Sequence, residues 1–88
     1  MTSHTYKIGE KWALDILFNN KRFEVRKDDR VTRPQVGDYV ELICPDLGIT
    51  FSLTVSYVLL SWDVPDLLPP QTLIFGFEDV CFDRDVKL

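Results

Sequence analysis

A ten-residue stretch, KRFEVRKDDR at residues 21–30, gathers the side chains of this chain that are best suited to bind a ligand. Lys21, Glu24 and Arg26 stand out within it. A glutamate accepts hydrogen bonds and can read an amino group, and an arginine offers a planar fork that fits phosphate or carboxylate. Lys21 adds a compact positive charge or, if it is removed from water, a general base. We interpret these three residues as candidates to line a cleft.

The alternation of residue types across 22–26 predicts a β-strand with two different faces. Phe23 and Val25 alternate with charged residues at a period of two, so we expect them to face the core. The other face then carries an arginine, a glutamate and an arginine in a row. That face can be a solvated surface that pairs its own charges, or the wall of a cleft, and the spacing leaves both alternatives open.

Other kinds of site lack the residues they need. The single histidine, His4, and two distant cysteines, Cys44 and Cys81, cannot supply a zinc site or a disulfide framework by themselves. The four glycines are scattered, so there is no glycine-rich phosphate loop. Cys44 falls on the inward face of a predicted strand, which indicates packing rather than a nucleophile. We therefore expect no catalytic residue, no metal site and no cofactor.

A short helix is predicted at residues 10–20. Lys11, Asp15 and Asn19 form a polar stripe at a spacing of four, and Asn19 and Asn20 suit the helix end because asparagine tolerates left-handed backbone. The apolar remainder of the helix is expected to be mostly buried: Trp12, Ala13, Leu14, Ile16, Leu17 and Phe18.

The fold class follows from the strands expected around this helix. One early helix among about five strands predicts an α+β domain with a curled, barrel-like sheet. We treat residues 1–88 as a single domain, in which the acidic segment 77–88 either adds an edge or trails as a tail. The strands are expected at residues 3–8, 22–26, 39–44, 49–60 and 72–77.

Composition and charge narrow the class of partner. With 45% hydrophobic residues the chain can build a core, and its net charge of −4 argues against general coating of nucleic acid. Six of the ten Lys and Arg residues nevertheless lie between Lys21 and Arg33, enough for one or two phosphates. The N-terminus lacks the apolar core of a signal peptide, and no apolar run approaches the roughly 20 residues of a membrane span. We expect a soluble, cytoplasmic protein without membrane contact.

Four segments of the chain resemble the ASCH domain, a member of the PUA-like superfamily of small β-barrels. The family signature GxKxxExR is matched by NNKRFEVR, with Asn19 in place of the glycine. A small bacterial and phage branch of the family is the most similar. The matching segments are HTYKI (4–8), FEVRKDDR (23–30), VGD (36–38) and LIFGF (73–77), which together reach almost the whole chain.

The resemblance implies a PUA-like barrel that binds RNA or a nucleotide-like ligand without catalysis. Lys21, Glu24 and Arg26 would line its cleft, and a base would stack on Trp12 or Tyr6. The resemblance also points to four supporting residues: His4, Lys7, Asp29 and Arg30.

Two alternatives remain. One branch of the family is an amidohydrolase that removes the acetyl group of acetylated cytidine with a lysine and a threonine in the motif. Here Arg22 and Glu24 stand where that threonine is expected, which argues against the activity. The other alternative is a phage or bacterial protein-interaction factor that binds a partner through Trp62, Leu67 and Leu68.

Overall fold

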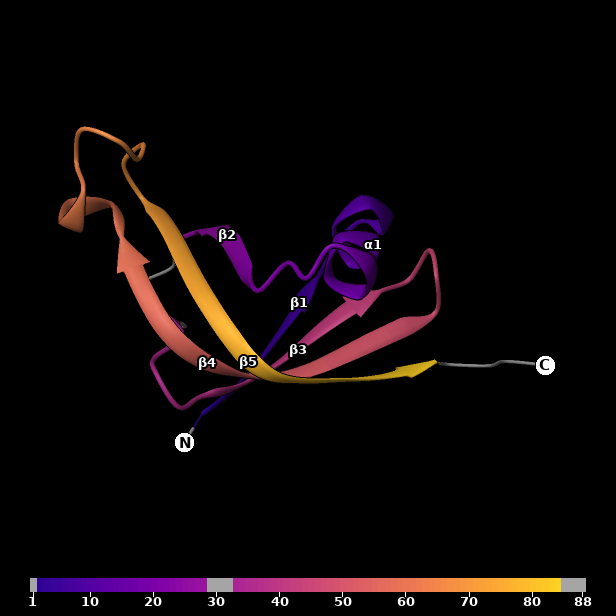
Figure 1. The fold of residues 1–88 in the computed structure, drawn as a ribbon. Coiled ribbons are helices and arrows are strands. Elements are labelled where there is room, and N and C mark those ends of the chain that lie inside the picture. The colour runs from indigo at the N-terminus through magenta and orange to yellow at the C-terminus, as the bar shows by residue number, and fades with distance from the viewer. Residues whose placement is uncertain (1, 29–32, 85–88) are drawn as a thin grey trace.

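The computed structural model describes residues 2–28 and 33–84, which form a curled five-stranded sheet and one α-helix (Figure 1). The sheet mixes parallel and antiparallel pairs and curls into a half-barrel, with the helix over its concave side. The predicted small α+β domain with one early helix is confirmed. The elements are β1 (Ser3–Lys7), α1 (Glu10–Phe18), β2 (Phe23–Lys27), β3 (Tyr39–Cys44), β4 (Ile49–Leu60), a 3-10 helix (Ser61–Asp63) and β5 (Thr72–Arg84).

The strand order places the two N-terminal strands at opposite edges of the sheet. The order is β1-β3-β4-β5-β2, with β1 and β3 parallel and the other neighbours antiparallel. The helix α1 follows β1 and precedes β2, so it carries the chain from one edge to the other (Figure 1). The strand that carries Glu24 and Arg26, β2, is therefore an edge strand.

The long strands β4 and β5 give the sheet its curl. Their register shifts twice, between Ser52 and Thr54 and between Val55 and Tyr57, and such bulges increase the twist of a strand pair. The first shift coincides with Asp79, whose φ of 55° is left-handed. Residues 78–84 of the acidic segment thus belong to β5 rather than to a tail, and residues 85–88 lie outside the described residues.

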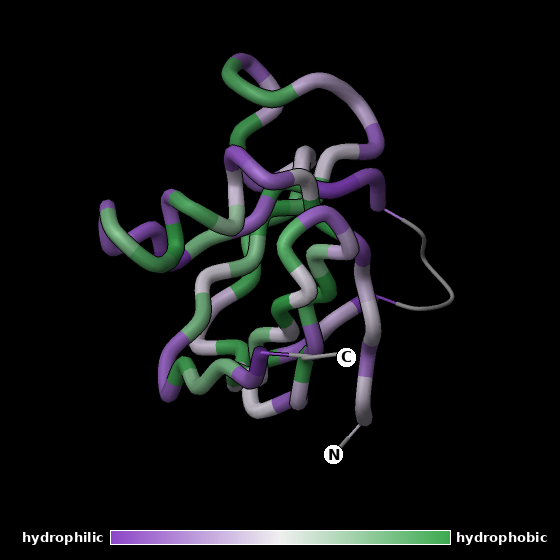
Figure 2. Tube along the Cα trace, turned by 90° about the vertical axis from the view of Figure 1, so that its right-hand side faces the viewer, coloured by the Kyte–Doolittle hydropathy of each residue, from purple (hydrophilic) through white to green (hydrophobic). Residues whose placement is uncertain are grey.

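Alternate residues of β3, β4 and β5 build the core. Phe51 and Phe75 are its largest fully buried side chains, and Cys44 is buried as expected for an inward-facing position. In Figure 2 hydrophobic stretches follow the strands through the middle of the molecule, whereas the connection at the top mixes hydrophobic and hydrophilic residues. No helix in the described part of the chain is long and apolar enough to cross a membrane.

The helix α1 ends where predicted but buries less than predicted. Asn20, just after the C-cap residue Asn19, has a left-handed φ of 54°, which confirms the asparagine stop. The prediction that most apolar helix residues are buried is wrong, because a nine-residue helix over a half-barrel contacts the sheet along one narrow side. Only Ala13 and Ile16 are buried in it, and the exposed apolar residues are Trp12, Leu14 and Phe18.

Candidate functional site

The edge strand β2 turns its charged face inward and its apolar face outward. Glu24 is 5% exposed, whereas Phe23 and Val25 are about half exposed, so the prediction that these two face the core is wrong. Glu24 lies opposite the core residue Phe75 of β5, and opposed residues share one face of a sheet. A glutamate can occupy this inner position only when neighbouring groups neutralise its charge.

Lys21, Glu24 and Arg26 form one ion-pair cluster. The Lys21 Nζ atom donates to Glu24 Oε1 and to the carbonyl oxygen of Phe23. Arg26 Nη2 lies 3.3 Å from Glu24 Oε2, so two cations share one carboxylate. The side chains of Lys21 and Glu24 are almost buried, whereas that of Arg26 is 26% exposed. The cluster therefore carries a surplus positive charge, and its most accessible member is an arginine.

Arg26 bridges the two edges of the sheet. Its Nη2 atom donates to the carbonyl oxygen of Lys7, at the end of β1, over 2.7 Å. The guanidinium carbon lies 5.1 Å from the ring centroid of Tyr6, which in turn stacks on Phe75. The Nε atom of Arg26 is buried and has no hydrogen-bond partner among the described residues. Leaving such a donor unpaired is costly, and the partial exposure of this side chain belongs to other atoms of Arg26.

His4 pairs with Asp38 of the VGD segment, and its ring stacks on that of Tyr6, the residue that contacts Arg26, with the two centroids 6.5 Å apart. The Nε2 atom of His4 lies 2.8 Å from Asp38 Oδ2, and Asp38 also accepts hydrogen bonds from the backbone N–H groups of Gln35 and Thr2. Burial raises the pKa of Asp38, but these hydrogen bonds, led by that of His4, outweigh burial and lower the pKa below its ordinary value of 3.8. The pair ties the start of β1 to the turn before β3, which is a structural role.

The other supporting residues contribute little that the structure describes. The side chain of Lys7 is exposed, and its carbonyl group is what Arg26 contacts. Asp29 and Arg30 lie outside the described residues. On either side of them, Arg33 donates to both carboxylate oxygens of Asp28, over 3.0 and 2.8 Å. The sequence analysis missed this pair, although opposite charges five residues apart around a loop were a visible signal.

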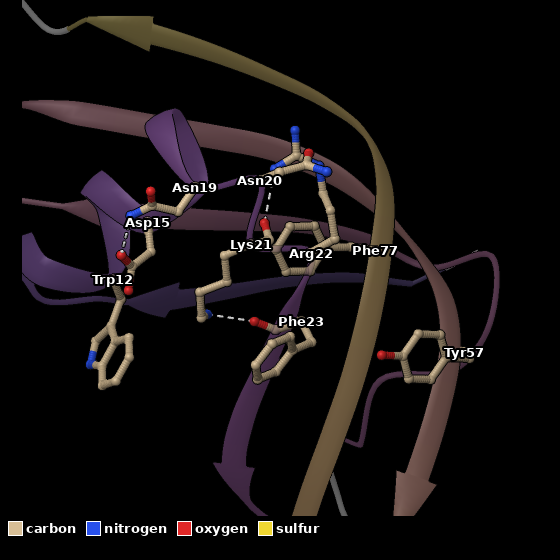
Figure 3. Close-up of a pocket in the computed structure, with 9 residues that line it drawn as sticks. All are labelled: Trp12, Asp15, Asn19, Asn20, Lys21, Arg22, Phe23, Tyr57 and Phe77. Carbon is tan, nitrogen blue, oxygen red and sulfur yellow. Dashed lines mark hydrogen bonds between the residues drawn. The ribbon is translucent and has the colours of Figure 1, made fainter.

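Two hollows flank the side chain of Lys21. One has a volume of about 600 Å³ and extends along the link between α1 and β2 (Figure 3). The other has a volume of about 290 Å³ and reaches Glu24 and Val25. Trp12 and Phe23 border both hollows, and Figure 3 shows the Lys21 side chain lying between their rings. The Lys21 Nζ atom is 5.6 Å and 5.0 Å from the two ring centroids.

The sequence analysis missed Tyr57 as a residue of this site. Tyr57 lines the larger hollow from β4, and its register partner in β5 is Gly76. A glycine inside a strand often marks a close approach of another group, so Gly76 was the signal that could have pointed to it.

The connection between β4 and β5 presents apolar side chains to solvent. Trp62 is about half exposed and Leu67 is 81% exposed, whereas Leu68 is partly covered. The guanidinium of Arg33 lies 4.6 Å from the centroid of a Trp62 ring. The connection is thus anchored to the residues that follow the motif strand.

Neither a metal-binding cluster nor a related protein helps to interpret the site. Within residues 2–28 and 33–84, no group of three or more His, Cys, Asp or Glu side chains could hold a metal ion. Cys44 and Cys81 are free thiols. The sequence matches no protein-family model and no curated protein. The site is therefore interpreted from its own residues.

Proposed function

We propose that this chain is an ASCH-type, PUA-like domain of the cytoplasm that binds RNA or a nucleotide-like ligand without catalysis. The observation that supports this most is the inward position of Glu24 between Lys21 and Arg26. These are the three charged positions of the GxKxxExR signature. The structure brings these three positions into one cluster, although a charged side chain is rarely turned inward.

The charge of the cluster supports an anionic group on the ligand. One carboxylate against two cations leaves a positive charge in an acidic chain, and Arg26 is its accessible part. The exposed part of the Arg26 guanidinium can donate a charge-assisted hydrogen bond to a phosphate oxygen. A ligand with one or two phosphates fits this cluster better than a long polyanion does.

Binding is favoured over amide hydrolysis, the alternative that the resemblance raises. Acyl transfer requires a nucleophile that a neighbouring group activates. The Lys21 amine is instead engaged by Glu24 and by the Phe23 carbonyl group. Arg22 also stands at the motif position where a threonine is expected. We therefore assign Lys21 to the wall of the ligand cleft, where it holds Glu24 in place.

A titration with a short single-stranded RNA and with nucleoside monophosphates tests this proposal. We expect Arg26→Ala to weaken binding by about tenfold or more, because a hydrogen bond between charged groups is lost. Lys27→Ala is the matched control, because it removes the same charge from the neighbouring exposed position of β2. The logarithm of the affinity for the RNA should fall with the logarithm of the salt concentration with a shallow slope of about −1, since few phosphates are engaged.

Equal affinities of Arg26→Ala and Lys27→Ala would contradict the assignment of the cleft. If none of these ligands binds, the proposed function fails. The exposed Trp62 and Leu67 then become the leading site, as the surface for a protein partner.

A further inference from the structure

Four aromatic rings line the larger hollow beside Lys21. One, Phe77 of β5, is buried, and the other three come from three different elements. They belong to Trp12 of α1, Phe23 of β2 and Tyr57 of β4, and each is about half exposed. A small domain gains stability by burying such side chains, so three of them around one hollow need an explanation. The volume of about 600 Å³ lies within the range of small-molecule pockets. We call this hollow the aromatic pocket.

Gly76 allows Tyr57 to reach this pocket. It lies opposite Phe23 in one strand pair and opposite Tyr57 in the other. A Cβ atom at Gly76 would lie 1.8 Å from Cε1 of Tyr57, so the ring lies directly across the glycine backbone. Figure 3 shows the Tyr57 hydroxyl group pointing from β4 toward Phe23. The tyrosine is thus placed over β5 as a wall of the pocket while remaining half exposed.

Polar groups on the opposite side of the pocket come from the end of α1. Asp15, Asn19 and Asn20 line it, and Asp15 accepts hydrogen bonds from Asn19 Nδ2 and Lys11 Nζ over 2.8 and 3.1 Å. A carboxylate offers about four acceptor positions, so Asp15 can accept from a ligand as well. Its pKa is lowered, first by the hydrogen bond from Asn19 and then by that from Lys11, which keeps it an acceptor.

The cations near the pocket are already engaged by the protein. Lys21 is held by Glu24, and Arg22 Nη1 donates to the carbonyl oxygens of Ile16 and Lys21 over 3.2 and 2.8 Å. Lys11, which donates to Asp15 and lies 4.4 Å from the centroid of a Trp12 ring, is a third cation beside the pocket and is exposed. A phosphate at this end of the pocket would meet the like charge of Asp15. A flat, uncharged ring with hydrogen-bonding edges matches both the aromatic walls and the polar end of the pocket.

We propose that the aromatic pocket binds one nucleobase that bears an exocyclic amino group, with its ring stacked on the aromatic walls and its amino group donating to Asp15. This inference rests on the proposed function, and it places the base away from Tyr6. Because Lys21 borders both the aromatic pocket and the hollow that reaches Glu24, a nucleotide bound here lies beside the motif. Carboxylates read the amino groups of bases elsewhere in the same way.

A comparison of adenosine with inosine tests the inference, because inosine carries an oxygen in place of the amino group. In a titration of the isotope-labelled chain, we expect adenosine to bind more tightly and to shift the indole N–H signal of Trp12 but not that of Trp62. Trp12→Ala and Tyr57→Ala should each weaken binding about tenfold, because a stacking surface is lost, whereas Trp62→Ala should not. Asp15→Asn should remove or invert the preference, because an amide can also donate to the inosine oxygen.

The outcomes separate this inference from the proposed function. If nucleotides bind, but Trp12→Ala and Tyr57→Ala leave the affinity unchanged and the signals of Tyr6 and Arg26 shift, the aromatic pocket is overturned while the motif cleft stands. If adenosine, inosine, nucleoside monophosphates and single-stranded RNA all fail to bind, both fall. Should Tyr57→Ala not fold, Trp12→Ala decides, because Trp12 is exposed on the helix.

Discussion

Glu24 brings a charge into the interior of a small domain, where an unpaired charge is costly. Lys21 and Arg26 compensate that cost, because each shares one oxygen of its carboxylate. Removing one member of a buried ion pair lowers the free energy of unfolding by more than the pair contributes, because a charge then stays buried without an opposite charge beside it. The three residues therefore act as one unit in stability as well as in binding.

Glu24→Ala should lower the free energy of unfolding by about 3 kcal/mol, because Lys21 and Arg26 are left facing each other without the carboxylate. Urea denaturation measures this change. Glu78→Ala, at an exposed position of β5, is the control and should change stability by less than about 0.5 kcal/mol. Similar losses in the two variants would show that the cluster is not a buried unit.

At this scale the sequence predicted which charges belong together but not where they face. The spacing singled out Lys21, Glu24 and Arg26, and the structure joins these three in one ion-pair cluster, whereas their role in a ligand cleft stays a prediction. Alternation shows that a strand has two faces, and hydrophobicity normally tells which one is inward, but in β2 the charged face is inward. The role of His4 depends on Asp38, which is 34 residues away along the chain and could not be foreseen.

Among the elements, the N-terminal ends of β1 and β3 are held together by hydrogen bonds to Asp38. Asp38 joins them by accepting from His4, Thr2 and Gln35. Its pKa is lower in the folded chain than the ordinary 3.8, so its contribution to stability is fully present above that value. As the pH falls below 3.8, the unfolded chain takes up the proton first, and the contribution is lost as the pH passes through the folded pKa.

Asp38→Asn should therefore reduce the acid sensitivity of the fold. Between pH 6 and pH 3 its free energy of unfolding should fall less than that of the parent chain, while at pH 6 the variant should be the less stable of the two. Urea denaturation at a series of pH values measures both. Asp46→Asn, at an exposed position in the turn after β3, is the control and should follow the parent chain. Parallel curves for Asp38→Asn and the parent chain would contradict this role of Asp38.

Strands could be predicted from the sequence where one face is apolar and the alternation is unbroken. The bounds expected for β3 and β4 agree with the structure for this reason. The end of β5 could not be predicted, because the bulge at Asp79 interrupts the alternation and residues 80–84 (VCFDR) do not resume it. Their strand conformation comes from pairing with β4, which is a long-range contact.

For the molecule as a whole, the C-terminal half of β5 completes the sheet. Phe82 lies opposite the buried Phe51, and their ring centroids are 6.1 Å apart. We expect a chain that ends at residue 77 to lose cooperative unfolding, because the first half of β4 loses its β5 partner and Phe51 loses its contact with Phe82. A chain that ends at Arg84 keeps every described strand and should unfold cooperatively. Thermal unfolding followed by circular dichroism compares the two, and a cooperative transition in the shorter chain would contradict this role of β5.

The class of fold could be predicted from the sequence, but whether the curled sheet closes into a barrel could not. Five strands around one helix indicated a curled sheet. In the structure, one side chain, Arg26, spans the gap between the edges by donating to the carbonyl oxygen of Lys7. Contacts of this kind depend on the exact separation of two strands, and no local pattern encodes that distance.

The open edges also bear on how the protein behaves at high concentration. Unpaired edge strands are the places where chains add to one another and grow into fibres, and charged residues on such strands oppose the growth. The edge strand β2 carries Arg26 and Lys27 together with the inward Glu24, and β1 ends at Lys7. A second strand that docked there would have to strip these charges of water or bring like charges together. We therefore expect the charged residues of the candidate site to oppose polymerisation, which constrains their replacement independently of any role in binding.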